Sequence, residues 1–207
     1  MLVDSAECVE RTWRKWATDH HLDPESVIAV AHGRRTLETV RIVAPQLSAE
    51  TELATLAASE STTSEGVYEI AGARELLEQL PAEKWAVVTS GIRAVAEFRL
   101  RHARLPVPPV MICADEIARG KPDPEGFLTA AARLGYSPGD CLVIEDAPAG
   151  IEAAGAAGMR TIAITTTFPP ERLAAADAVV ERLTDLGIRV DGDHIHMDFG
   201  HSPLAIT

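Results

Sequence analysis

A lysine and a pair of neighbouring acids stand out in this sequence because their types and surroundings suit phosphate and metal chemistry. Lys121 lies in Gly120-Lys121-Pro122-Asp123-Pro124, and Glu145-Asp146 directly follows the apolar run Leu142-Val143-Ile144. Lysine is a compact positive charge suited to a phosphate group. Adjacent acids at the end of a buried strand are unfavourable unless something binds them, and Mg²⁺ with carboxylate and water ligands is the usual solution. The pattern therefore predicts a phosphate held by Lys121 and Mg²⁺ held by Glu145 and Asp146. A surface lysine and a solvated acidic pair are the alternatives.

A third candidate is the hydroxyl segment Thr89-Ser90-Gly91, which follows the apolar Val87-Val88 and precedes a predicted helix near Ile92. A turn from a strand into a helix directs hydroxyl and free backbone N–H groups towards an anion. The alternative is an ordinary helix start capped by a hydroxyl. We assign Thr89, Ser90 and Gly91 to phosphate binding together with Lys121.

The elements that must position these residues alternate from about residue 71 onwards. Apolar strands are expected at 85–88, 110–113, 141–144, 161–164 and 178–180, and helices at 74–80, 92–102, 124–134 and 148–157. This alternation predicts an α/β fold with a parallel sheet covered on both faces. Ligands of such sheets bind beyond the carboxyl ends of the strands. The three candidate segments fall at or just after predicted strand ends, so we expect them to converge.

The first third of the chain differs, since it shows only helical patterns. Val9, Trp13 and Trp16 recur at helical spacing, and Asp23-Pro24 has the form of a helix start. Further helices are expected at 36–43 and 49–59, followed by a polar hinge at 61–65.

Composition restricts the class of partner. The chain has 207 residues and a formal net charge of −12, which argues against nucleic acid and anionic membranes as partners. No apolar run approaches the roughly 18 residues that span a bilayer. Cys8, Cys113 and Cys141 are far apart and show no metal-ligand spacing, which favours a reducing cytoplasm.

In their order and spacing, Thr89, Lys121 and Glu145-Asp146 resemble the second, third and fourth motifs of the haloacid dehalogenase-like hydrolase superfamily. The stretch Asp146-Ala147-Pro148-Ala149-Gly150-Ile151-Glu152-Ala153-Ala154 is typical of its branch of sugar phosphatases, glycerol-phosphate phosphatases and beta-phosphoglucomutase. The resemblance runs from Leu2 to about Leu186. It implies a Rossmann-like parallel sheet core with an inserted helical cap. The expected division is a remnant of the first motif at 1–5, the cap at 6–70, the core at 71–190 and a C-terminal hairpin or tail at 191–207.

The family's first motif is matched only in its tail, by Leu2-Val3-Asp4-Ser5. Its two catalytic aspartates would fall before residue 1, as they would if a start codon had been assigned too late. In the family the first aspartate attacks phosphorus to give an aspartyl phosphate, the second transfers protons, and Mg²⁺ offsets charge. The resemblance also implies that the central first strand is missing, which would leave two half-sheets with unpaired edges. We therefore expect the chain as given to be inactive and poorly folded.

Within the cap, His32-Gly33-Arg34-Arg35 resembles a segment of the sugar and polyol phosphatases, so His32, Arg34 and Arg35 are candidate substrate residues. A helix start with a solvated basic pair is the alternative. The implied function is Mg²⁺-dependent hydrolysis of a small sugar or polyol phosphate, a small phosphorylated metabolite, by a cytoplasmic monomer or weak dimer. Two other hypotheses remain: a phosphosugar mutase of the beta-phosphoglucomutase type, and a catalytically dead protein that binds a phosphometabolite.

One further Asp-x-Asp occurs near the C-terminus, in Val190-Asp191-Gly192-Asp193. A permuted first motif would have this form. Asp-Gly is, however, a strong hairpin-turn signal between the segments 187–190 and 194–199, and we favour the hairpin. His194, His196, Asp198 and His201 are a possible metal cluster there, but we favour a solvated tail.

Overall fold

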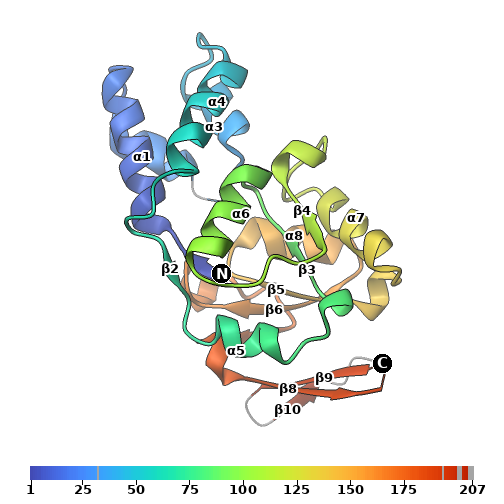
Figure 1. Cartoon of the computed structure of the whole chain (residues 1–207). Helices are drawn as coiled ribbons and strands as arrows, with labels where there is room; N and C mark the ends of the chain where they lie inside the picture. Colours follow the sequence, from blue (N-terminus) through green and yellow to red (C-terminus); the bar gives the residue numbers. More distant parts are fainter. Residues whose placement is uncertain (32, 193, 200–201, 205–207) are drawn as a thin grey trace.

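The computed structural model describes residues 1–31, 33–192, 194–199 and 202–204. Its first part is a cap of four helices, α1 (Ala6–Asp19), α2 (Pro24–Ala31), α3 (Thr36–Val43) and α4 (Ala49–Glu60). The cap stands to one side of the sheets (Figure 1). Its buried centre includes Trp13 and Trp16, whose rings meet edge to face at 5.3 Å. The helical spacing of the two tryptophans therefore marks a core face, as expected.

Two chain segments join the cap to the rest of the molecule. β1 (Val3–Asp4) pairs antiparallel with β2 (Tyr68–Glu69), which brings the two ends of the cap insertion together. Asp4 Oδ1 accepts a hydrogen bond of 3.0 Å from the N–H of Ala6, the first residue of α1, whereas the N-cap residue is Ser5, whose side chain makes no capping hydrogen bond. The short pairing between residues distant in sequence was not expected from the pattern.

The second part is an α/β core of parallel strands and helices, as the sequence predicted. β3 (Ala86–Val88) pairs with β4 (Val110–Ile112), and β5 (Leu142–Glu145), β6 (Arg160–Ile164) and β7 (Ala178–Val180) form a second parallel sheet in that order. The helices are α5 (Ala73–Glu78), α6 (Arg93–His102), α7 (Glu125–Leu134) and α8 (Pro148–Ala156). Short 3₁₀ helices occur at Ala82–Lys84, Ala114–Glu116, Pro138–Asp140, Pro170–Arg172 and Leu183–Asp185.

The two parallel sheets are separate. Within the part of the chain that the structure describes, no backbone pairing joins β3 to β5. Between them lies a largely apolar cavity of about 760 Å³, with Val87 of β3 and Val143 of β5 among its walls and Met1 and Leu2 at its side. The predicted division into two half-sheets is confirmed, and the carboxyl ends of β3 and β5 open on the same cavity.

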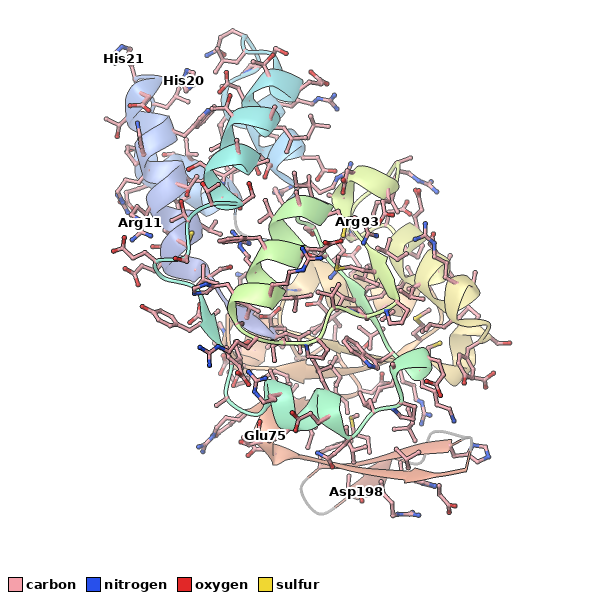
Figure 2. The ribbon with its side chains drawn as sticks, in the orientation of Figure 1. Arg11, His20, His21, Glu75, Arg93 and Asp198 are labelled. Atoms are coloured by element: carbon pink, nitrogen blue, oxygen red, sulfur yellow. The ribbon has the colours of Figure 1, made fainter. Side chains whose placement is uncertain are left out.

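The C-terminal segment forms an antiparallel sheet of β8 (Leu186–Asp191), β9 (His194–Phe199) and β10 (Ser202–Leu204). Asp191 pairs with His194 across the turn, so the predicted hairpin is confirmed, and its first strand begins at Leu186, one residue before the expected start at 187. Met197 packs into the main core cluster. Asp198 lies at the opposite end of the molecule from His20 of the cap (Figure 2). No helix of the described residues combines the length and apolar character needed to cross a bilayer.

Candidate functional site

Lys121 ties the carboxyl ends of the two half-sheets together. Its Nζ donates to the backbone carbonyl of Val88 at the end of β3 (3.2 Å) and pairs with Glu145 Oε1 at the end of β5. The ammonium also lies over the ring of Phe127 in α7, 5.0 Å from the centroid. The side chain is only 14% exposed. The charge is therefore held in one place by three contacts, each from a different element.

Glu145 is buried and has a partner for each carboxylate oxygen. Oε1 faces Lys121, and Oε2 accepts from the backbone N–H of Asp146 (2.7 Å) and of Ala147 (3.0 Å). Gly150 in the first turn of α8 makes this arrangement possible, because a Cβ there would overlap the Glu145 carboxyl group. Glycine is thus required at position 150 by the close approach of Glu145.

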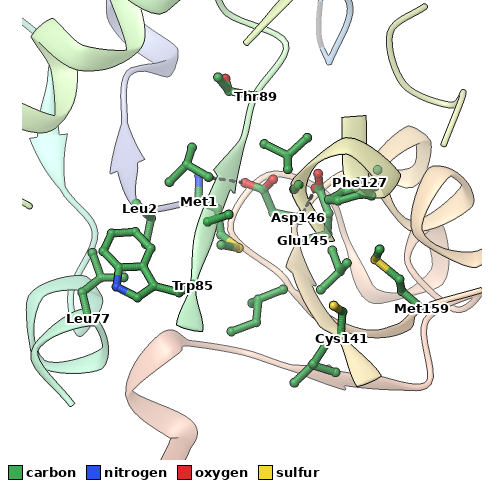
Figure 3. Close-up of a pocket in the computed structure, with 18 of the residues that line it drawn as sticks. Met1, Leu2, Leu77, Trp85, Thr89, Phe127, Cys141, Glu145, Asp146 and Met159 are labelled. Carbon is green, nitrogen blue, oxygen red and sulfur yellow. Dashed lines mark hydrogen bonds and ion pairs between the residues drawn. The ribbon is translucent and has the colours of Figure 1, made fainter. Parts of the chain in front are cut away.

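Asp146 points to different neighbours from those of Glu145. Its Oδ2 accepts from the hydroxyls of Thr166 (3.0 Å) and Thr167 (2.8 Å), and the Met1 ammonium lies 3.4 Å away (Figure 3). Burial by itself would raise the pKa of Asp146. The ammonium and the two hydroxyls stabilise the ionised form more strongly, and the pKa is lowered. Asp146 is therefore a carboxylate in surroundings that already hold a positive charge.

The hydroxyl segment forms the turn between β3 and α6. Thr89 Oγ1 accepts from the N–H of Gly91 (3.1 Å), and the Thr89 N–H donates to the carbonyl of Ile112 on β4 (2.9 Å). The Gly91 carbonyl accepts from the N–H of Ala114 (3.0 Å). These bonds hold the start of α6 at the carboxyl edge of its half-sheet.

The structure brings the candidate core residues together at one end of the cavity. Its polar wall is formed by Thr89, Ser90, Gly91, Lys121, Glu145 and Asp146. A cation beside hydroxyl and backbone donors suits a phosphate dianion, and a largely buried carboxylate beside them suits a divalent cation.

The fit of Mg²⁺ rests mainly on Asp146. Mg²⁺ in proteins needs only one or two carboxylates, because water and substrate phosphate complete its coordination. Glu145 Oε1 forms a close ion pair with Lys121. Asp146 Oδ2 lies 3.4 Å from the Met1 ammonium, so a positive charge is already accommodated beside this oxygen. No group of three or more His, Cys, Asp or Glu suited to a metal is found among the described residues, and this includes His194, His196 and Asp198. The donor set fits a metal shared with a bound phosphate.

The three cap candidates have different surroundings. His32 lies outside the described residues. Arg34 is exposed. Arg35 is mostly buried and donates to the backbone carbonyls of Ile117 and Ala118 in the segment before Lys121. The cap contributes Gly33 to the wall of the large cavity.

Sequence reasoning missed three contributors to this site, namely Phe127 below Lys121 and the two threonines beside Asp146. Thr166 and Thr167 follow β6, which ends at Ile164, so the strand-end rule applied to β5 would also have found them. Phe127 had no comparable signal, because an aromatic residue on a helix normally indicates core packing.

The chain is similar to known proteins over most of its length. The model of a haloacid dehalogenase-like hydrolase family matches residues 1–164. Hexitol phosphatase A of Escherichia coli K12 is 39% identical over 192 residues, which cover 90% of this chain and 89% of that protein. Glycerol-1-phosphate phosphohydrolase 2 of Saccharomyces cerevisiae is 35% identical over 209 residues, covering 95% and 84%. The crystal structure of a hydrolase from Pseudomonas syringae superposes with a TM-score of 0.78 at 25% identity and covers 89% of this chain and 91% of that one.

Proposed function

The chain belongs to the haloacid dehalogenase-like hydrolases, and we propose that it serves the Mg²⁺-dependent hydrolysis of a small sugar or polyol phosphate. It is a hydrolase of phosphatase type by family, with phosphatases among its relatives. The observation that carries the proposal is the position of Lys121, which is fixed between the ends of β3 and β5 with Thr89 and Asp146 on the same cavity wall. The names hexitol phosphatase and glycerol-1-phosphate phosphohydrolase support the polyol or sugar class.

In this proposal the phosphate group is held by Lys121 and by the donors of the hydroxyl segment. Lys121 Nζ, the Thr89 hydroxyl and the Ser90-Gly91 backbone surround the phosphoryl oxygens, and the ion pair with Glu145 fixes the position of the Lys121 ammonium. Asp146 would be the main ligand of Mg²⁺, with Glu145 beside it, and the ion would neutralise phosphoryl charge. We also assign Arg34 and Arg35 of the cap to substrate binding, together with His32, which lies outside the described residues. Their neighbour Gly33 lines the cavity.

The residue that accepts the phosphoryl group is the last part of the proposal. The resemblance implies an aspartyl phosphate, and we propose that chemistry for this enzyme. Glu145 and Asp146 are the carboxylates among the described residues that line the polar end of the cavity, and both have other roles in the proposal. An assay should therefore compare this chain with a version extended before Met1 by an apolar strand ending in Asp-x-Asp-Gly. Turnover in the extended version alone would assign the nucleophile to that strand.

The test is phosphate release from hexitol phosphates and glycerol phosphates, with Mg²⁺ or with a chelator. Replacing Lys121 with alanine is expected to lower kcat/KM by about 10²–10³, the range for removal of one preorganised donor to a developing charge. Lys15→Met, which removes an exposed lysine of the cap, is the matched control. No release from any ester by the extended version would refute hydrolysis. A sugar bisphosphate formed without release would indicate a mutase instead, and phosphosugar binding without turnover would indicate a binding protein.

We further propose that the protein is a cytoplasmic monomer or weak dimer. All three cysteines are free thiols, which suits a reducing compartment. Sedimentation of the purified chain tests the oligomeric state.

A further inference from the structure

Arg35 of the cap reaches across to the segment that carries Lys121. It directly precedes α3, and its guanidinium donates from Nη1 to the carbonyl of Ile117 (3.3 Å) and from Nη2 to the carbonyl of Ala118 (3.2 Å). Both acceptors lie more than 80 positions away in sequence. The side chain is only 13% exposed. A planar fork of donors is the feature of arginine that fits two successive backbone carbonyls.

The guanidinium is also held from its own helix. Arg35 Nε donates to Glu38 Oε1 at 2.7 Å, and Nη2 lies 2.5 Å from the same oxygen. All three guanidinium nitrogens therefore have acceptors, and the carboxylate balances the charge of the buried arginine. Charge-assisted hydrogen bonds of this kind are stronger than neutral ones.

Gly120 provides the space for this contact. A Cβ at position 120 would lie 2.7 Å from Arg35 Nε and 2.8 Å from its Cδ, which is closer than such atoms approach. The residue directly precedes Lys121. A small cavity of about 10 Å³, close to the size needed for a single water molecule, is walled by Arg35, Gly120 and Lys121 together with Thr89 and Ser90. The contact thus adjoins the proposed phosphate site.

We propose that Arg35 is a positioning residue that couples closure of the cap to the placement of Lys121. With the cap closed, Arg35 fixes the carbonyls of residues 117 and 118, and this restrains the short segment that ends at Lys121. Without the contact, that segment loses its anchor to the cap and the Lys121 ammonium samples other positions. The catalytic consequence rests on the proposed function, whereas the restraint on Lys121 does not.

A second contact keeps the cap attached when Arg35 is removed. Arg99 of α6 donates to Glu60 at the end of α4 (2.7 Å), and both side chains are largely buried. Trp16 and Glu52 hold the cap helices together independently, through a hydrogen bond of 2.8 Å from Trp16 Nε1. Loss of Arg35 is therefore expected to release the 117–120 segment without unfolding the cap.

Chemical labelling of lysine measures the restraint directly. The chain has three lysines, Lys15, Lys84 and Lys121. Lys15 is 76% exposed and serves as the internal standard, and Lys121 is the buried one. Acetic anhydride labelling of the full chain, read by mass spectrometry of peptides, gives the rate at Lys121 relative to Lys15. In Arg35→Ala this ratio is expected to rise about tenfold or more, because a single hydrogen bond to a charged group already contributes a factor of about that size.

Two further variants test whether the restraint on Lys121 depends on the planar guanidinium of Arg35 and on its position, rather than on its positive charge alone. Arg35→Lys keeps the charge but lacks the fork, so labelling of Lys121 should still rise. Gly120→Ala displaces the Arg35 side chain without removing it and should act in the same direction, with the double variant Arg35→Ala/Gly120→Ala no worse than either alone. Arg41→Ala is the matched control, because it removes an arginine of α3 whose pair with Glu50 is exposed. It should leave the ratio unchanged.

The outcomes are distinct. Unchanged Lys121 labelling in both Arg35→Ala and Gly120→Ala would overturn the coupling. In an active enzyme, Arg35→Ala should lower kcat/KM by about 10- to 100-fold, the range for a slightly misplaced catalytic group, and should weaken inhibition by inorganic phosphate. Faster labelling with unchanged kcat/KM would overturn the catalytic part. If the version extended before Met1 hydrolyses no phosphate ester, the proposed function fails, while the labelling result still decides the coupling.

Discussion

An added strand in the cavity between β3 and β5 is expected to stabilise the protein strongly. The Met1 ammonium lies beside Asp146, at the carboxyl end of β5. A strand added before Met1 can therefore pass through the cavity and end at Met1, parallel to both β3 and β5. Five apolar residues would span about 17 Å, and a short polar stretch would join them to Met1. Such a strand would meet an unpaired edge on each side.

The magnitude follows from burial and ordering. Five buried Val, Ile or Leu side chains contribute about 8–15 kcal/mol, at roughly 1.5–3 kcal/mol each. Ordering five backbone residues opposes this by about 5–10 kcal/mol. When the low ends of the two ranges are paired, and likewise the high ends, the net gain is about 3–5 kcal/mol. For a chain of this size each kcal/mol raises Tm by about 2–4 °C. A rise in Tm of about 10 °C is therefore expected.

Thermal unfolding followed by circular dichroism measures this change, and dye binding to exposed apolar surface should fall in parallel. A Gly-Ser extension of equal length is the control, because it adds the same chain without side chains to bury. Both proteins must be compared as monomers, since an exposed apolar strand also favours aggregation. Equal Tm values for the two extensions would refute the reasoning, because they would show that the cavity does not accept a strand.

Three further predictions concern buried groups. Gly150→Ala should lower the free energy of unfolding in urea by about 1–3 kcal/mol, because the added Cβ overlaps the Glu145 carboxyl group. The control is Gly155→Ala in the same helix, where the Cβ meets open space and the change should be neutral or stabilising. Equal effects of the two substitutions would contradict the close approach at position 150. Burial raises the pKa of Glu60 despite the opposing effect of Arg99, so the folded state retains a proton above the ordinary value of 4.5. We therefore compare the unfolding free energies of wild type and Glu60→Gln. Their difference should favour wild type most below pH 4.5 and decline as pH rises through the folded-state pKa of Glu60. A difference that is flat or rises between pH 4 and 8 would argue against this. Burial raises the pKa of the Cys113 thiol to about 11, so at pH 8 iodoacetamide should modify the half-buried Cys141 first, and peptide mass spectrometry showing equal rates would refute this order.

Much of the architecture could be predicted because it depends on local pattern. The helix at Thr36–Val43 and the strand at Ala178–Val180 have the predicted bounds, and the other predicted core elements differ by only one or two residues at their ends. Apolar periodicity and turn residues act over a few positions, so they can be recognised without knowing the fold. The strand-end rule likewise placed Thr89, Lys121 and the two acids on one cavity wall.

The sequence by itself thus determined the order of elements, the separation of cap from core and the chemical types gathered at the strand ends. Only the tertiary structure decided which group meets which. Glu145 and Asp146 are neighbours in sequence, yet one faces Lys121 and the other faces Thr166 and Thr167. Arg35 meets a segment more than 80 positions away. Such contacts depend on how helices and sheets pack in three dimensions, and local periodicity carries no information about that packing.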